Sequence, residues 1–542
     1  MKKIVAIILV LCLAVALLAC NKNSGGSNDS NLNSGDTGGS VSGSENNSGN
    51  DGNNPAAPKR DTLNIALTQD RGTLDPMYLL GHDFLYAINM IYEPLWKFDE
   101  NNNQIWVLAT GVDVIEPTKW HIHIREGVTF ANGDKFDAYD VLFSFMRGNT
   151  RVGEPKFFNN LDEENTKVID DYTLELIWLV HDMVHMSTVA TMLMFDKDAT
   201  DEATVATVTN GTGPYVVTDY VTNSHFNLTL RDDYWGEKPA IQNLSFKILS
   251  EDSQRVNAIQ TGTVDIAAIP FQDISYVQGL QGINVDITPS LTTKSLYFNI
   301  SPTSVFHDNV DARMAVAHAI EREGIVDIAY SGHVTPSRMP MSVANKDWEE
   351  RFLDLGIYGE PDYGYNPTLA KELAEKSGLT SKTIKLINNG SSDEVVMCEL
   401  IQANLKEIGV TVDVNNLDMG SWASILFDDT QYDMAIDFTS GPSGTLAQNL
   451  SAWYQYGGGM SYTYNSHPGD ERYRALIDGI MAISDPKQLS DIYMQLFEIH
   501  AEAMLWYGLV DMINAYALNA DLRGDAKLFG SAFDYSKFYW AS

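Results

Sequence analysis

The sequence predicts an α/β protein of at least two lobes. Its 542 residues are more than one hydrophobic core ordinarily organises. Hydrophobic residues make up 44% of the chain and aromatic residues 10%, which is enough to fill large packed cores. From Thr62 onward, segments with the two-residue period of strands alternate irregularly with segments of helical period. This mixture favours α/β lobes over an all-α or an all-β body.

The charge balance argues against a nucleic-acid partner. The chain carries 36 basic and 72 acidic residues, which gives a formal net charge of −36. A surface this acidic repels phosphate backbones. The three cysteines are too few for a disulfide framework.

The first twenty residues have the pattern of a secretory signal. Lys2 and Lys3 precede a continuous apolar run, residues 4–18, that is shorter than the roughly 20 residues of a membrane-spanning helix. The run ends in Leu17–Cys20, which resembles a bacterial lipobox. That resemblance implies a signal peptide at 1–19, cleavage before Cys20 and a lipid on Cys20. A plain signal peptide with an incidental cysteine is the alternative.

A low-complexity segment follows the cysteine. Residues 21–54 contain 26 Asn, Ser or Gly and almost no bulky apolar side chain, so nothing there offsets the entropy of ordering. We expect residues 20–60 to form a flexible tether with a reach of roughly 35 Å. Cleavage would remove two basic residues and no acidic one, so the net charge would fall from −36 to −38, and Cys398 would be the only free thiol.

Local patterns predict several elements of the body. Alternation of apolar and polar residues predicts strands at 63–67, 120–124 and 410–414. Asp137 is a plausible N-cap for a helix running to about Arg147, and a long amphipathic helix is expected from Asp485 to about Glu502. Other helices are expected to end at a glycine that takes the left-handed conformation, at Gly262, Gly378 and Gly409.

Motifs for catalysis or metal binding are weak. The chain has no Gly-x-Ser-x-Gly elbow, no P-loop and no His-Glu-x-x-His, so we expect neither an enzyme nor a cofactor nor any catalytic residue. His121 and His123 share one face of a strand and could bind a metal ion. We favour instead that both side chains are satisfied by hydrogen bonds on the sheet. A Met/His cluster, His181 to Met194, contains soft ligands that can hold copper. We favour its methionines as core filler and predict no metal site.

Several segments, in order from residue 62 to about residue 540, resemble the peptide/nickel family of extracellular solute-binding proteins, the receptors of ABC importers. The most specific match is the block from His121 to Arg147, which contains Ile124–Phe130, Asn132–Asp134 and Phe136–Val141. The other matching segments are Gly72–Pro76, Ile91–Leu95, Gly211–Tyr215, Tyr234–Pro239, Gly262–Ile266, Val310–Arg313, Ala317–Ile320 with Arg322, Asn366–Pro367 and Ile401–Leu405. Most of these residues can also be explained as turns and aromatic anchors, and we expect that they build the fold.

The resemblance implies an α/β, two-lobed, periplasmic-binding-protein-like fold with a hinge. Lobe one would comprise residues 61–295 and 508–542, with an extra subdomain inserted at about 110–210. Lobe two would comprise residues 296–507. A ligand would be captured between the lobes by hinge closure.

The sequence departs from the family where peptide receptors read the ends of a short peptide. In the family, an aspartate in a Trp-x-Gly-Asp segment receives the peptide α-ammonium. Here Phe438 falls at the aromatic position and Gly441 at the aspartate position. The loop 388–392 offers no arginine for a peptide carboxylate. Amide, hydroxyl and aromatic groups therefore predict a ligand without exposed end charges, such as a longer or capped peptide or a saccharide, and weak binding of free dipeptides.

The predicted ligand-binding residues come from loops of both lobes. Trp422 and Trp453 are among them because tryptophans can stack on sugars, although most tryptophans pack in cores. The full set is Met77, Tyr78, Gly81 and His82 in lobe one, and Asn388, Asn389, Trp422, Phe438, Thr439, Ser440 and Trp453 in lobe two.

The resemblance implies a monomeric extracytoplasmic receptor of an ABC importer. It would bind a small-molecule or peptide-like ligand, partner a permease and ATPase complex, and be held at the outer face of the cytoplasmic membrane by its lipid anchor alone. Alternatives within the fold are receptors for an oligosaccharide or for a metal or metal chelate. Outside that class, the chain could be a surface hydrolase or a pheromone-sensing or adhesive lipoprotein.

The lipobox generates the first testable prediction. Metabolic labelling with a clickable fatty acid should mark the wild-type protein and not Cys20→Ser, because Cys20 is the residue that would carry the lipid. Cys398→Ser serves as the control and should label like the wild type. Equal labelling of the wild type and Cys20→Ser would contradict a lipid on Cys20.

Overall fold

A computed structural model gives the fold of residues 60–541. It describes this range apart from gaps at 79–83, 100–102, 151–155, 159, 182–184, 338, 340, 346, 350, 353–363, 427, 429, 440–444, 448, 451–470, 478, 484, 525 and 528–532. Cys20 and residues 21–59 of the predicted tether therefore lie outside the described residues, whereas Arg60 forms an ion pair with Asp265. Within the described part of the chain, no helix is both long enough and apolar enough to cross a bilayer.

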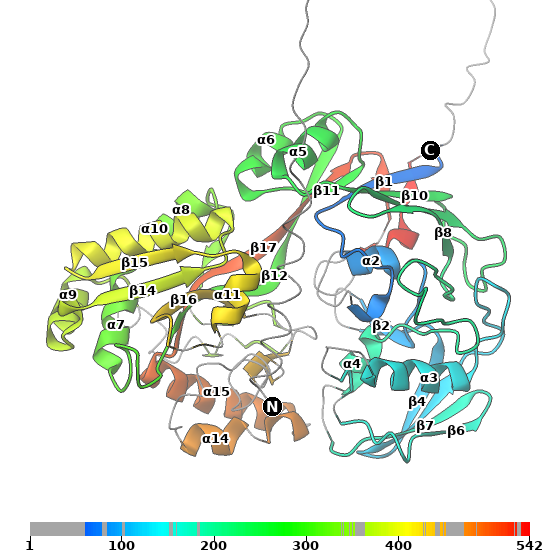
Figure 1. Ribbon diagram of the computed structural model, residues 1–542, viewed down its shortest axis with the longest axis horizontal. Coiled ribbons are helices and arrows are strands. Elements are labelled where there is room, and N and C mark those ends of the chain that lie inside the picture. The colour runs from blue at the N-terminus through cyan, green and yellow to red at the C-terminus, as the bar shows by residue number, and fades with distance from the viewer. Residues whose placement is uncertain are drawn as a thin grey trace, which may run out of the picture. The chain divides into compact units, whose positions relative to one another are not determined.

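The backbone is organised around an 11-stranded mixed sheet (Figure 1). Its strands follow the order β15-β14-β16-β12-β17-β11-β1-β10-β9-β8, and β13 pairs with β17 beside this path. The two long strands β12 (Ile283–Phe298) and β17 (Trp506–Asn519) are antiparallel neighbours near the middle of the order. Strands on one side of this pair belong to one core and strands on the other side to a second.

The first part of the chain forms the side of the sheet that contains β1. Its elements are β1 (Thr62–Leu67), α2 (Phe84–Ile88), β2 (Trp96–Phe98), β3 (Gln104–Trp106), β4 (Ala109–Glu116), β5 (Lys119–Ile124), α3 (Ala138–Asn149), β6 (Lys167–Asp170), β7 (Thr173–Ile177), α4 (His185–Thr191), β8 (Tyr215–Val221), β9 (His225–Leu230), β10 (Asn243–Ile248), α5 (Asp252–Gln260), β11 (Ile266–Ala268) and α6 (Ile274–Gln278). Strands β4, β5, β7 and β6 form a separate four-stranded sheet, within the range where an inserted subdomain was predicted.

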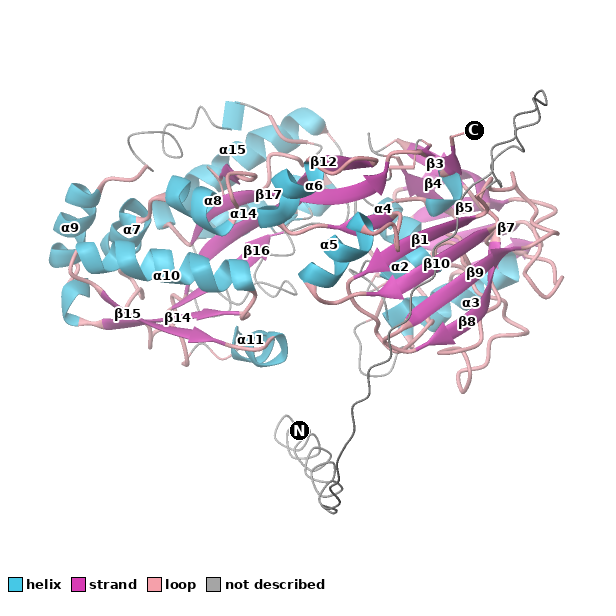
Figure 2. Ribbon diagram, turned by 90° about the horizontal axis from the view of Figure 1, so that it is seen from above, coloured by secondary structure: helices cyan, strands magenta, loops and turns pink. Residues whose placement is uncertain are grey.

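The middle of the chain forms the side that contains β14. Its elements are α7 (Val310–Ala319), α8 (Arg322–Ala329), β13 (Thr335–Pro336), α9 (Pro367–Lys376), β14 (Thr383–Asn388), α10 (Ser392–Glu407), β15 (Thr411–Asn416), α11 (Met419–Leu426), β16 (Met434–Thr439), α14 (Glu471–Ile477) and α15 (Pro486–Ala503). Figure 2 shows α10 lying along β14 and β15. The chain then returns through β17 and ends in the small pair β18 (Leu522–Arg523) and β19 (Tyr539–Trp540).

Buried apolar residues divide into two large clusters and one small one. The first large cluster is built from residues between Leu63 and Ile266 together with residues 522–538. The second lies between Leu296 and Val510. The small cluster joins α5, α6 and β11 to β17. The mixed α/β, two-lobed architecture predicted from the sequence is therefore confirmed, while the exact lobe boundaries stay a prediction.

The local sequence signals for helices and strands are also confirmed. Asp137 caps α3, accepting a hydrogen bond from Tyr139 N, and Asp140 completes a capping box. Asp485 caps α15 in the same way through Lys487 N. The glycines expected after α5, α9 and α10 have left-handed φ angles of 68°, 75° and 84°. Only glycine adopts this backbone without strain, so these helices end where the sequence indicated.

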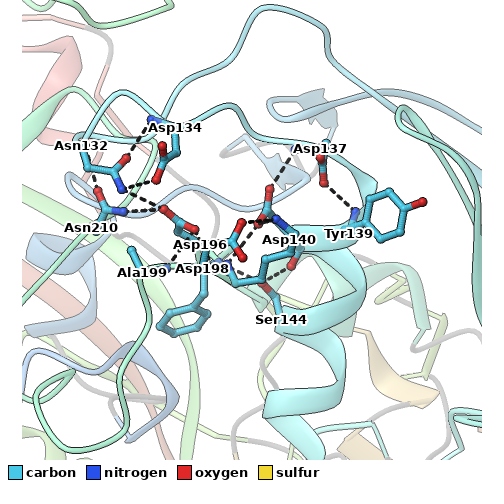
Figure 3. Close-up of polar contacts among 12 residues, drawn as sticks. Asn132, Asp134, Asp137, Tyr139, Asp140, Ser144, Asp196, Asp198, Ala199 and Asn210 are labelled. Atoms are coloured by element: carbon cyan, nitrogen blue, oxygen red, sulfur yellow. Dashed lines mark hydrogen bonds and ion pairs between the residues drawn. The ribbon is translucent and has the colours of Figure 1, made fainter.

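The block that carries the strongest family resemblance forms a buried polar network (Figure 3). Asp196 accepts hydrogen bonds from Asn132 Nδ2 at 3.1 Å and Asn210 Nδ2 at 2.8 Å. Asp140 accepts from the backbone N–H groups of Asp137 and Lys197 at 3.0 and 3.1 Å. Both aspartates are 1% exposed, and burial raises the pKa of Asp140 to about 6. These side chains replace regular backbone pairing in a loop region, so this part of the block builds the fold, as expected.

Two further family segments meet around a buried glutamate. Glu93 is 7% exposed and accepts hydrogen bonds from Tyr234 Oη at 2.8 Å and Trp235 Nε1 at 3.0 Å. Beside it, Gly213 N donates to Ile91 O at 2.8 Å. A Cβ on Gly213 would lie 2.6 Å from Met90 O, so this close approach of two backbones requires glycine.

Glu93 gives the fold a predicted pH dependence. Burial raises the pKa of Glu93 from 4.5 to about 7, which means that the folded state favours the protonated form. The stability linked to this group is complete below about pH 4.5 and is lost as pH rises through about 7. In Glu93→Gln, the decline in the free energy of unfolding between about pH 5 and about pH 8 should shrink by up to about 3 kcal/mol.

Urea denaturation at several pH values measures this change. Glu237→Gln, in an exposed residue of the same segment, is the matched control and should keep the wild-type slope. An unchanged slope in Glu93→Gln would show that Glu93 is ionised in the folded protein throughout this range.

Candidate functional site

Three strand ends of the second lobe gather most of its predicted ligand-binding residues. Strand β14 is parallel to both β15 and β16, so the carboxyl ends of all three meet at one edge of the sheet. Asn388 ends β14 and Asn389 follows it, while Phe438 and Thr439 end β16. Trp422 lies in α11, which follows β15. Crevices at this edge are the usual ligand sites of open α/β sheets.

The two asparagines are engaged within their own loop. Asn388 is fully buried; its Nδ2 donates to Asn416 Oδ1 at 2.6 Å and its Oδ1 accepts from Gly390 N at 2.8 Å. Asn389 Nδ2 donates to Glu394 Oε1 at 2.9 Å, and its Oδ1 accepts from Ser391 N at 3.0 Å. Their amides therefore shape the 388–391 loop and have little left to offer a ligand.

A buried ion pair beneath this loop was missed by the sequence analysis. Glu394, in the first turn of α10, is 0% exposed and forms an ion pair with Lys294 of β12. Burial lowers the pKa of Lys294, but the carboxylates of Glu394 and Asp393 outweigh it and the pKa is raised. The two residues are 100 positions apart, and no local pattern marks either one. Only the order of strands in the sheet brings Lys294 of β12 to the first turn of α10.

The aromatic residues of the second lobe differ in their surroundings. Phe438 is half-buried, and Lys294 Nζ lies 5.7 Å from the centre of its ring, within the range of a cation–π contact. Trp422 is only 6% exposed and packs in the large apolar cluster of this lobe. Thr439 is 1% exposed and pairs with Thr293 across the sheet. Trp422 belongs to the core, and Phe438 packs against the same cluster while remaining partly exposed.

The predicted loop of the first lobe is held by a buried arginine. Arg147, near the end of α3, makes a two-pronged ion pair with Asp75: Nη1 lies 3.1 Å from Oδ1 and Nη2 lies 2.7 Å from Oδ2. Asp75 Oδ1 also accepts from Met77 N at 3.1 Å. Met77 is 2% exposed whereas Tyr78 is 41% exposed. The clamp thus turns Met77 inward and leaves Tyr78 available to solvent.

Four predicted ligand-binding residues have no described position. Gly81, His82, Ser440 and Trp453 all lie outside the described residues.

The histidines and methionines weighed as metal ligands take part in ordinary packing. His121 Nε2 lies 3.1 Å from Glu175 Oε2, and His123 Nε2 lies 2.8 Å from Asp113 Oδ2. His185 stacks on Trp178 with ring centres 3.7 Å apart. Met192 and Met194 are buried in the apolar cluster of the first lobe. Among the described residues no three His, Cys, Asp or Glu side chains are grouped to hold a metal ion.

Comparison with known families identifies the class of protein. Residues 105–461 match the model described as bacterial extracellular solute-binding proteins, family 5. The match covers more than half of the chain, and the chain belongs to this family. The resemblance seen in the sequence is confirmed.

Curated relatives within this family bind different ligands. The chain is 23% identical over 352 residues to the glutathione-binding protein GsiB of Pectobacterium atrosepticum, covering 61% of this chain and 65% of that protein. It is 24% identical over 388 residues to the nickel-binding periplasmic protein of Escherichia coli K12, covering 66% of this chain and 71% of that protein.

Solved structures share the fold. The ABC transporter substrate-binding protein CtaP of Listeria monocytogenes has a TM-score of 0.77 at 20% identity, covering 89% of this chain and 100% of that one. NikA of Brucella suis in complex with Fe(III)-EDTA has a TM-score of 0.77 at 18% identity, covering 88% and 99%. AppA of Bacillus subtilis in complex with a nonapeptide has a TM-score of 0.74 at 18% identity, covering 89% and 99%.

The clamp on the first-lobe loop generates a stability prediction. Arg147→Met leaves the carboxylate of Asp75 buried without its counter-charge, since the two side chains are 6% and 3% exposed. The free energy of unfolding should fall by about 3–5 kcal/mol, measured by urea denaturation. The matched control is Arg472→Met, which removes an ion pair between side chains that are 62% and 55% exposed and should cost less than about 1 kcal/mol. Equal losses in the two variants would show that the Asp75 pair is not what holds this loop.

Proposed function

We propose that this protein is the extracytoplasmic receptor of an ABC importer, capturing a peptide-like ligand between its two lobes and delivering it to a membrane permease. The family match across residues 105–461 carries this proposal. The two-lobed fold supports it, because β12 and β17 join the lobes through one strand pair, and closure about such a joint is a common way to capture a ligand. The receptor binds and releases its ligand, and no bond is made or broken.

A peptide-like ligand without free end charges suits the second-lobe edge. The ring of Phe438 is half-buried there, the amides of Asn388 and Asn389 are engaged within their own loop, and the ammonium of Lys294 is paired with Glu394. A free α-ammonium or carboxylate would need a counter-charge of its own in such a site. Longer or capped peptides avoid that cost, and free dipeptides should bind weakly.

A metal chelate is the second candidate ligand. One curated relative is named as nickel-binding, and one structural neighbour was solved with Fe(III)-EDTA. In this chain, the described residues hold no preformed group of metal ligands. A metal would therefore arrive inside a chelate, bound through the chelate's own surface. An oligosaccharide is the third candidate and rests on stacking against Phe438.

The lipid anchor and the tether complete the proposed arrangement. A lipid on Cys20 would hold the body at the outer face of the cytoplasmic membrane, and residues 21–60 would let it reach the permease as a monomer. The lobes would comprise residues 61–295 with 508–542, and residues 296–507.

Native mass spectrometry of the protein as purified is the test of the ligand class. A retained mass that fragments as a peptide is the expected result. A retained chelate or sugar would replace the peptide in the proposal. The three ligand classes are then added in turn: peptides as glutathione and a nonapeptide, a chelate as nickel–histidine, and a sugar as a maltooligosaccharide. If the protein binds none of them, the proposed receptor function is overturned.

Phe438 provides a site-specific prediction for the same receptor. Calorimetry with an acetylated, amidated nonapeptide should show affinity about tenfold lower for Phe438→Ala than for the wild type, because a flat apolar wall is lost. Tyr276→Ala, in a tyrosine of α6 that is 48% exposed, is the control and should bind like the wild type.

Small-angle scattering should show a smaller radius of gyration for the protein with the nonapeptide than without it. Equal affinity for Phe438→Ala and the wild type would move the site elsewhere, and tight binding of free dipeptides would refute a site without end charges.

A further inference from the structure

The loop at the end of β14 is fixed by one carboxylate. Glu394 is 0% exposed and accepts hydrogen bonds from Asn389 N at 3.1 Å and Asn389 Nδ2 at 2.9 Å, and it also pairs with Lys294. A buried carboxylate is tolerated only with such compensation. The conformation of residues 388–391 therefore depends on Glu394 keeping its partners.

The ammonium that completes this set belongs to a strand shared by the two lobes. Lys294 lies in β12, directly between Phe438 of β16 and Val510 of β17 in the sheet register. The pairing of β12 with β17 shifts register twice, between Pro289 and Thr293 and again between Lys294 and Ser295. Lys294 thus lies between two irregularities of the strand pair, where the ladder is interrupted on both sides.

A second set of contacts reaches the same helical turn from the other side of β17. Asp393, which precedes Glu394, accepts a hydrogen bond from Tyr330 Oη at 2.8 Å. The ring of Tyr330 packs edge-on against Phe271, with ring centres 5.1 Å apart. Phe271 follows β11 and packs with the small apolar cluster of α5 and α6. The first turn of α10 is therefore tied both to β12 and to the segment after β11.

We infer that Lys294 and Glu394 are positioning residues that couple the 388–391 loop to the strand pair joining the lobes. The inference rests on the proposed function, in which this loop edges the ligand site. A ligand that fixes the loop also fixes Glu394, and through the ion pair it holds Lys294 and β12. Coupling of this kind is reciprocal, so closure of the lobes in turn orders the loop for the ligand.

Hydrogen–deuterium exchange of the ligand-free protein tests the coupling directly. In Glu394→Gln the pairing with Lys294 is lost, and the amides of Asn389, Gly390 and Ser391 should exchange about tenfold faster than in the wild type. Lys294→Met, which leaves the loop sequence untouched, should accelerate the same three amides, and Glu394→Gln should accelerate exchange in residues 293–296 of β12. Glu394 bonds Asn389 directly, so the first effect also follows from a local role. The other two effects appear across the ion pair, on the partner element, and a merely local role of either residue would not produce them.

Lys97→Met is the matched control. Lys97 pairs with the buried Asp534 at 2.5 Å, with side chains 28% and 5% exposed. Their chain neighbours Trp96 and Phe533 belong to the other apolar cluster. Lys97→Met should lower the melting temperature without changing exchange in residues 388–391. Circular dichroism checks the folding of every variant. If Glu394→Gln does not fold, the comparison of Lys294→Met with Lys294→Arg takes its place. Arg keeps the positive charge, so Lys294→Arg should preserve the wild-type exchange. Unchanged exchange of Asn389–Ser391 in Lys294→Met would overturn the coupling.

A ligand measurement separates failure of this inference from failure of the proposed function. With the acetylated, amidated nonapeptide as probe, Lys294→Met should bind about tenfold more weakly than Lys97→Met. If the wild type binds the nonapeptide and Lys294→Met binds it as tightly as Lys97→Met does, the coupling is refuted. The proposed receptor function is unaffected by that result. If the wild type does not bind the probe, the proposed peptide ligand is wrong, and the exchange measurement still decides the coupling.

Discussion

The antiparallel pairing of β12 with β17 is the constraint on which the rest of the structure depends. These strands run through the main sheet between β16 and β11, and their residues contribute to apolar clusters on both sides. The lobes are therefore joined by backbone hydrogen bonds of one sheet. Such a connection resists separation of the lobes while twist and bending remain available to the strands. The register shifts between Pro289 and Thr293 and between Lys294 and Ser295 interrupt the ladder hydrogen bonds, and the strand pair can bend there.

Both candidate ligand loops are held from behind by buried ion pairs. Arg147 clamps Asp75 in the first lobe, and Lys294 pairs with Glu394 in the second. A buried pair contributes little net stability compared with apolar packing, but breaking it is costly. Its value here is geometric: each pair fixes the direction in which a loop leaves a strand or helix. Ligand-facing groups can then vary without loss of the supporting loop.

Sequence patterns predicted the elements that depend on local chemistry. Asp137, Asp485 and the glycines after three helices marked helix ends correctly because caps act within one turn. The family resemblance supplied the two-lobed architecture, which periodicity alone could not. The second-lobe site was predicted only in outline. Asn388 and Asn389 fall at the expected strand end, yet their amides turn into the loop, and Lys294 reaches it from a strand about a hundred residues earlier. Non-local contacts of this kind leave no trace in local periodicity.

The position of β17 in the sequence has a consequence for the order in which the protein can fold. Strands β11 and β12 lie beside a partner, residues 506–519, that is synthesised long after both of them. Until that partner emerges, the centre of the sheet has open edges on both sides, and neither half can be completed. Such long-range pairing makes folding slow and late. A chain that must be threaded across a membrane before it folds gains time from this arrangement, because the strand that closes the main sheet is made after every other strand of that sheet.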